Sequence, residues 1–125
     1  MLHTLLVALG GAIGASLRHL TSLAALRILG PQFPFGTMTV NIVGSFAMGV
    51  LVELIARRFG ASSELRLFLA TGLLGGYTTF SAFSLDTIVL WERGAATLAV
   101  CYVVASVLVS IAALVAGLSL GRAIF

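Results

Sequence analysis

Two glycines, two threonines and two phenylalanines stand together in the segment GGYTTFSAF, residues 75–83, inside an apolar stretch. Adjacent glycines followed by β-branched threonines make a poor helix interior. In hydrocarbon, irregular backbone is tolerated only where protein buries it or where it lines a cavity. The sequence therefore predicts a membrane-spanning helix that is broken near Gly75–Thr79, with an ion site beside the break.

Phe80 and Phe83 lie three residues apart, on one face of the half-helix that is expected after the break. The rim of a phenyl ring is the positive part of its quadrupole. Two such rims beside hydroxyl groups suit a small, strongly hydrated anion whose lost waters must be replaced, whereas a cation path needs carboxylates or carbonyls. Carbonyls released at the break are suited to holding one structural cation.

Two other apolar stretches carry polar side chains four residues apart, which places each set on one helix face. The first stripe consists of Thr37, Asn41 and Ser45, and the second of Tyr102, Ser106 and Ser110. A buried asparagine in a span either joins helices, a contact worth ~1 kcal/mol or less, or lines a wet path. Taken alone, Asn41 favours the first interpretation.

Arg18 continues the face on which Gly10 and Gly14 lie in the first apolar stretch. Small residues at this spacing let another helix approach closely. Arg18 lies several turns from either end of a long helix, where an arginine either reaches an interface or attracts an anion. The sequence leaves both interpretations of Arg18 open.

The composition is that of an integral membrane protein. Of the 125 residues, 60% are hydrophobic and 9% are charged, whereas about a quarter of a soluble domain is charged. At ~20 residues per span, residues 1–125 have room for a single domain of four helices. The net charge of +3 is too small and scattered to suggest nucleic acid. No grouping of metal ligands, nucleophile motif or carboxylate pair supports an enzyme.

The predicted fold is all-α, with four transmembrane helices separated by loops rich in glycine, proline or charge. The N-terminus has no basic region or cleavage site, so the first stretch is expected to be a retained span. The expected helices cover 2–29, 37–57, a third from a Ser62 or Ser63 cap to the break, its second half at 80–91, and 94–120.

The chain contains no convincing internal repeat, although broken-helix ion sites usually lie where two inverted repeats meet. A second copy inserted upside down would supply the missing half. Two arginines fall on one side of the predicted bundle and four on the other: Arg27 and Arg93, against Arg57, Arg58, Arg66 and Arg122. Because this bias permits either orientation, we expect an antiparallel, dual-topology homodimer.

Three motifs resemble those of the Fluc (CrcB) family of fluoride channels: GGAIGASLRH (10–19), GTMTVNIVGSF (36–46) and GGYTTFSAF (75–83). Their order and spacing and the chain length agree, so the resemblance covers essentially the whole chain. It implies a passive channel of a bacterial inner membrane that releases cytoplasmic fluoride down its gradient. It also implies an antiparallel dimer with two pores.

The resemblance further implies roles for individual residues. Phe80 and Phe83 would be the pore phenylalanines and Asn41 the pore amide. The backbone carbonyls of Gly75 and Thr78 would hold a central sodium ion on the two-fold axis. The remaining polar track and the vestibule arginine would comprise Thr79, Tyr102, Ser106, Ser110 and Arg18.

Two other functions fit the residues less well. A small multidrug exporter also has four helices, but it needs a membrane-embedded glutamate in its first helix for proton coupling, whereas the first helix here has Arg18 and no acid. A non-transporting assembly subunit, in which both stripes only join helices, leaves the position of the break beside Phe80 and Phe83 unexplained.

Overall fold

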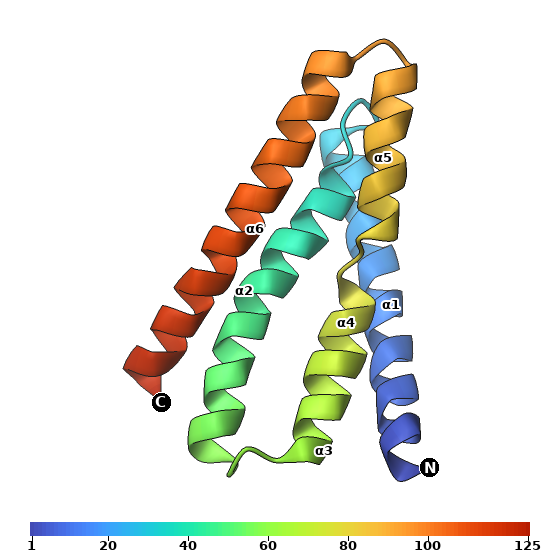
Figure 1. Ribbon diagram of the computed structural model, residues 1–125. Coiled ribbons are helices and arrows are strands. Elements are labelled where there is room, and N and C mark those ends of the chain that lie inside the picture. The colour runs from blue at the N-terminus through green and yellow to red at the C-terminus, as the bar shows by residue number, and fades with distance from the viewer.

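The computed structural model describes residues 1–125, and all of its regular elements are helical. Four helical segments are long and apolar enough to cross a membrane, which confirms the predicted fold class (Figure 1). The segments are α1 (Leu2–Leu29), α2 (Phe35–Arg58), a third span made of α3 (Ser63–Leu65), η1 (Arg66–Leu74), α4 (Gly75–Tyr77) and α5 (Ser81–Glu92), and α6 (Ala96–Ile124).

The helix bounds follow the loop signals of the sequence. α1 covers the predicted range, and Gly30 ends it with φ 86°, in the left-handed region that favours glycine. α2 begins at Phe35 rather than Thr37, directly after Pro34. The third span is capped by Ser62, whose Oγ accepts a hydrogen bond from the Leu65 N–H at 3.3 Å.

Residues Arg66–Leu74 form a π-helix, which no sequence pattern predicted. This segment packs backbone to backbone against α1. A Cβ at Gly10 would collide with the carbonyl of Phe68, and a Cβ at Gly14 with that of Leu73. The small-residue face of α1 therefore serves close helix packing, as its spacing predicted.

The break in the third span lies at Thr78–Phe80, the C-terminal end of the predicted region. Thr78 adopts an extended conformation, with φ −84° and ψ 162°. Gly75 and Gly76 stay helical. The small size of Gly76 serves packing, because a Cβ there would lie 2.7 Å from the Gly11 carbonyl oxygen, whereas a Cβ at Gly75 would make only an ordinary contact. Gly76 thus brings the broken span against α1, and the break itself follows it.

The bundle consists of two close pairs, α1 with the third span and α2 with α6 (Figure 1). In the second pair, Gly49 faces the carbonyl of Leu114 and Gly117 faces that of Phe46, so that a Cβ at either glycine would clash. The break in the third span, between α4 and α5, lies at mid-height of the bundle in Figure 1. This arrangement places the break beside the N-terminal half of α2, where Asn41 and Gly44 lie.

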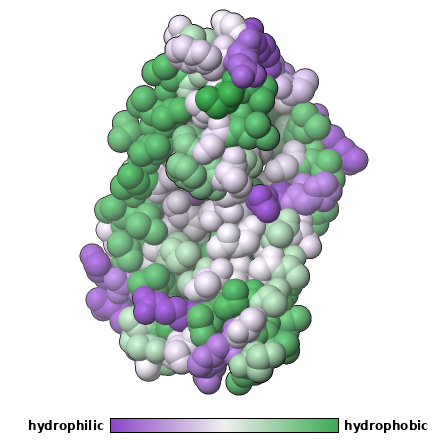
Figure 2. All heavy atoms as spheres, turned by 45° about the vertical axis from the view of Figure 1, so that its right-hand side comes forward, coloured by the Kyte–Doolittle hydropathy of each residue, from purple (hydrophilic) through white to green (hydrophobic).

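The surface is largely apolar, since only 18 of the 125 residues are buried and many large hydrophobic side chains point outward. Figure 2 shows green, hydrophobic side chains over much of one face, with purple, hydrophilic ones near its two ends and a further group at mid-height on the right. Such a surface is stable in hydrocarbon and not in water. The protein is therefore a multi-pass membrane protein.

Candidate functional site

Asn41 of α2 holds the backbone of the break in place. Its Nδ2 donates to the carbonyl of Thr79 at 3.0 Å, and its Oδ1 accepts from the Thr79 N–H at 2.8 Å. These two bonds fix the orientation of the amide, because the reverse orientation would set donor against donor and acceptor against acceptor. An amide nitrogen carries two N–H donors, so one N–H of Asn41 remains for another partner.

Thr79 also caps the half-helix that follows. Its Oγ1 accepts a hydrogen bond from the Ala82 N–H at 3.2 Å and lies 3.4 Å from the Oγ of Ser81. A hydroxyl in this position satisfies one of the N–H groups that the start of a helix leaves free. Thr79 is buried, so this cap lies inside the bundle.

These contacts divert two backbone N–H groups from the carbonyls that they would bond in a continuous helix. In an uninterrupted helix the Thr79 N–H would donate to the carbonyl of Gly75, and the Ala82 N–H to the carbonyl of Thr78. Here they donate to the side chains of Asn41 and Thr79. The carbonyls of Gly75 and Thr78 thereby lose their usual helical donors.

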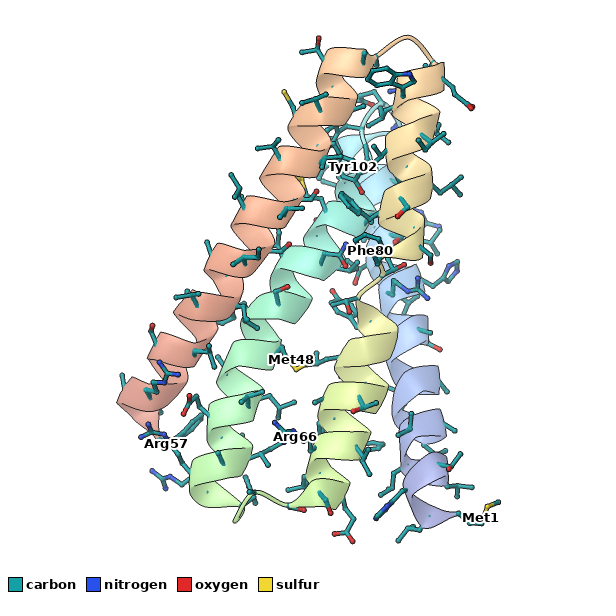
Figure 3. The ribbon with its side chains drawn as sticks, viewed as in Figure 1. Met1, Met48, Arg57, Arg66, Phe80 and Tyr102 are labelled. Atoms are coloured by element: carbon teal, nitrogen blue, oxygen red, sulfur yellow. The ribbon has the colours of Figure 1, made fainter.

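A cavity of about 380 Å³ lies between α2, the break and α6, and no charged residue lines it. In Figure 3, Phe80 lies at the break and Met48 projects from α2 toward the third span farther down the bundle. The lining residues are Asn41, Gly44, Ser45, Met48, Thr78, Thr79, Phe80, Phe83, Ser106, Val107, Ser110, Ile111 and Leu114. The cavity therefore brings parts of both predicted stripes together with both phenylalanines.

Two serines of α6 bring unpaired hydroxyls to this cavity. The Oγ atoms of Ser106 and Ser110 are buried, and neither makes a hydrogen bond. By contrast, Ser16 and Ser84 each donate to a carbonyl one turn back in their own helices. A buried hydroxyl without a partner costs free energy, so these two are available to a bound ion.

Phe80 at the break and Phe83 in the first turn of α5 contact each other but differ in exposure. Their ring centroids are 5.6 Å apart, with the planes at 57°. Phe83 is buried and its ring centroid lies 5.2 Å from that of Tyr102. Phe80 is 77% exposed. One ring is thus fixed in the core, and the other projects out of the single chain.

Tyr102 and Arg18, both predicted to belong to the site, do not line this cavity. Tyr102 is fully buried beside Phe83, and its hydroxyl donates to Asp86 Oδ2 at 3.2 Å. Arg18 lines a second pocket of about 260 Å³. Because Thr79 lines both pockets, Arg18 lies on the α1 side of the break and the serines on its α6 side.

Sequence patterns missed the apolar part of the lining. Gly44 and Met48 each lie three residues beyond a member of the α2 stripe, so helical spacing could have found them. On α6, the same spacing applies to Val107, three residues before Ser110, and to Leu114, four residues after it, whereas Ile111 carried no such signal. Apolar residues cover most of α6, so the packing of the bundle is needed to show that these three face the cavity.

A family model described as "CrcB-like protein, Camphor Resistance (CrcB)" matches residues 5–118. Among similar curated proteins, one from Chelativorans sp. (strain BNC1) is 64% identical over 99% of both chains. One from Agrobacterium fabrum is 59% identical over the whole of both, and one from Mesorhizobium japonicum 58% over 99%. Each of the three is named "Fluoride-specific ion channel FluC". The protein described here belongs to the CrcB-like family.

Proposed function

We propose that this protein is a fluoride-selective channel that lets fluoride leave the cytoplasm across the bacterial inner membrane, down its gradient and without an energy source. Full-length relatives that are 64% and 59% identical carry the name of a fluoride-specific channel. These matches cover 99% and 100% of both chains. The proposal therefore takes fluoride and membrane lipid as the partners of the chain.

The observation that carries this proposal is the lining of the cavity between α2 and α6. It is lined by the two serines with unpaired hydroxyls and by Asn41, whose amide has one N–H more than Thr79 uses, and it contains no carboxylate. A fluoride ion that leaves water needs donors of this kind to replace its hydration. The absence of negative charge keeps the cavity open to an anion.

The phenyl rings complete the lining with weakly positive rims. Phe80 and Phe83 contact each other at the break and border the same cavity as Ser106. A ring rim interacts favourably with an anion while offering nothing to a cation. In the proposed pathway, fluoride exchanges hydroxyl donors for ring rims as it passes the break.

We further propose that the channel is an antiparallel, dual-topology homodimer with two pores. Phe80 is 77% exposed in the single chain, and Gly75, five residues earlier in the sequence, is exposed as well. A second copy in the opposite orientation would cover these residues by setting one break against the other. The weak arginine bias between the two ends of the chain is compatible with insertion both ways.

The carbonyls of Gly75 and Thr78 are the groups that would hold a sodium ion between two copies. They fit a hard cation because their usual helical donors are engaged elsewhere, and because carbonyl oxygens can replace its hydration shell. Gly75 has no side chain to cover its own backbone. When bound, the ion would supply a fixed positive charge at the centre of the dimer.

The proposed function is tested with purified protein in liposomes loaded with potassium fluoride. Valinomycin carries potassium out, so fluoride release follows if the protein conducts the anion, and an electrode records it. We expect rapid release of fluoride and no comparable release from liposomes loaded with potassium chloride. Liposomes that keep their fluoride after valinomycin, although protein is incorporated, would refute the proposal.

A further inference from the structure

A line of aromatic rings joins the loop between α1 and α2 to the cavity. The ring centroids lie 4.9 Å apart for Phe35 and Phe33, 5.4 Å for Phe33 and Tyr102, and 5.2 Å for Tyr102 and Phe83. A further 5.6 Å separates Phe83 from Phe80. All four pairs lie within the range of favourable aromatic contacts. The loop is therefore connected to the cavity lining through side-chain contacts alone.

Tyr102 is the central ring of this line and has little freedom to turn. It is fully buried, and the ring of Phe33 meets it edge-on at 88°. Phe83 contacts its ring as well, and Asp86 accepts its hydroxyl hydrogen bond. Because the core is close-packed, a change in the volume or shape of Phe33 must move Tyr102 or leave a void against it.

The loop holds Phe33 at a fixed place. Arg93, at the end of α5, donates from Nη2 to the carbonyl of Gln32 at 2.6 Å, and the Gln32 side chain donates to the Leu29 carbonyl at 3.2 Å. Pro31 and Pro34 stand close on either side of Phe33, and proline fixes its own φ. The ring of Phe33 packs against the cluster that contains Phe83 and Tyr102.

We propose that Phe33 is a positioning residue for fluoride conduction. It lies outside the cavity and acts by holding Tyr102, which in turn holds Phe83 in the orientation that lines the cavity. The inference rests on the proposed function, because its effect is read as fluoride release. Whether Phe33 holds Tyr102 in place, which we call the positional link, can be measured separately, without a transport assay.

The test uses the two tyrosines of the chain, Tyr77 and Tyr102. Full-length protein labelled with 3-fluorotyrosine gives two ¹⁹F resonances, which Tyr102→Phe assigns. Phe33→Leu keeps an apolar side chain but removes the ring. Phe33→Tyr keeps a ring and adds a third resonance of its own, so the Tyr102 resonance of this variant is again identified by adding Tyr102→Phe. Phe59→Leu is the matched control, since Phe59 is a half-exposed loop phenylalanine between α2 and α3. Each variant is also assayed for fluoride release from liposomes.

We expect Phe33→Leu to shift the Tyr102 resonance, to leave that of Tyr77 in place, and to slow fluoride release roughly tenfold or more, because small displacements of lining groups have effects of this size. Phe33→Tyr restores both readouts, and Phe59→Leu changes neither. An unmoved Tyr102 resonance in Phe33→Leu, or a moved one with wild-type release, would overturn the inference. Wild-type protein that releases no fluoride, while Phe33→Leu still moves the resonance, would refute the proposed function and leave the positional link standing.

Discussion

Asn41 shows how one side chain serves both the backbone and the cavity. The sequence left open whether this amide joins helices or lines a wet path. Its two hydrogen bonds to Thr79 join α2 to the break, and the same residue borders the cavity. The two interpretations are therefore compatible, because the amide has one more donor than the backbone of Thr79 uses.

Asn41→Asp tests this double role with almost no change in shape. The carboxylate keeps an acceptor for the Thr79 N–H, but it loses the donor to the Thr79 carbonyl and adds a negative charge to the cavity. Losing a buried hydrogen bond costs about 1–3 kcal/mol, so fluoride release is expected to fall roughly 10- to 100-fold. The fluoride electrode measures this, and thermal unfolding in detergent reports the weakened break. Release within twofold of the wild type would contradict the assignment of Asn41.

Removing the hydroxyl of Ser106 or Ser110 is expected to slow fluoride release without lowering stability, unlike Asn41→Asp, which is expected to lower both. Each hydroxyl is buried without a partner, so its removal in Ser106→Ala or Ser110→Ala relieves a cost of folding. The unfolding temperature is expected to stay constant or rise, while fluoride release falls about tenfold if one hydrogen bond to the ion is worth ~1.4 kcal/mol. Ser16→Ala, which removes a hydroxyl bonded within α1, is the control. A loss of stability without a loss of release would show that the two hydroxyls are structural.

At the scale of elements, the number and extent of the helices were predictable, whereas their local geometry was not. Apolar length and the glycine- and proline-containing loop at residues 30–34 define α1 and α2, because spans must satisfy their own backbone and loops carry turn residues. The π-helix at Arg66–Leu74 has no pattern of its own in the sequence. The two hydrogen bonds between Asn41 and Thr79 join residues 38 positions apart, so they form only once the bundle has packed.

The close packing of the glycine face of α1 can be tested by adding a methyl group at two glycines of this helix. A Cβ at Gly14 would collide with the backbone of the third span, whereas a Cβ at Gly11 would lie 3.9 Å from its nearest neighbour, the Gly72 carbonyl oxygen. Overpacking of this kind costs about 1–3 kcal/mol. Gly14→Ala is therefore expected to unfold at a lower temperature in detergent than the wild type, and Gly11→Ala at nearly the same temperature. Equal unfolding temperatures for the two variants would contradict the close packing.

At the scale of the whole molecule, the single chain leaves part of its own site uncovered. Phe83 is packed in the core, whereas Phe80 from the same break is 77% exposed. The arginines are divided unequally but not strongly between the ends of the bundle. The proposed antiparallel dimer accounts for both features, since each copy covers the exposed ring of the other and neither end is confined to the cytoplasm.

Dual topology predicts that a residue in the loop between α2 and α3 reaches both sides of the membrane. A cysteine at Ser62, in a Cys101→Ser background, leaves one thiol in the chain. In whole cells, a membrane-impermeant maleimide is expected to label about half of the protein, because an antiparallel two-fold dimer contains both orientations equally. Labelling of all of the protein, or of none until the cells are opened, would show a single orientation and rule out the antiparallel dimer.

The central claim, that fluoride passes the phenylalanine pair at the break, is tested most directly by fluoride release from liposomes containing Phe80→Ile or Phe83→Ile. Isoleucine keeps an apolar side chain at each position but has no ring rim to face an anion. We expect both variants to fold with wild-type helicity and to release no fluoride, while Phe59→Ile releases it at the wild-type rate. Wild-type release from both Phe80→Ile and Phe83→Ile would contradict the account.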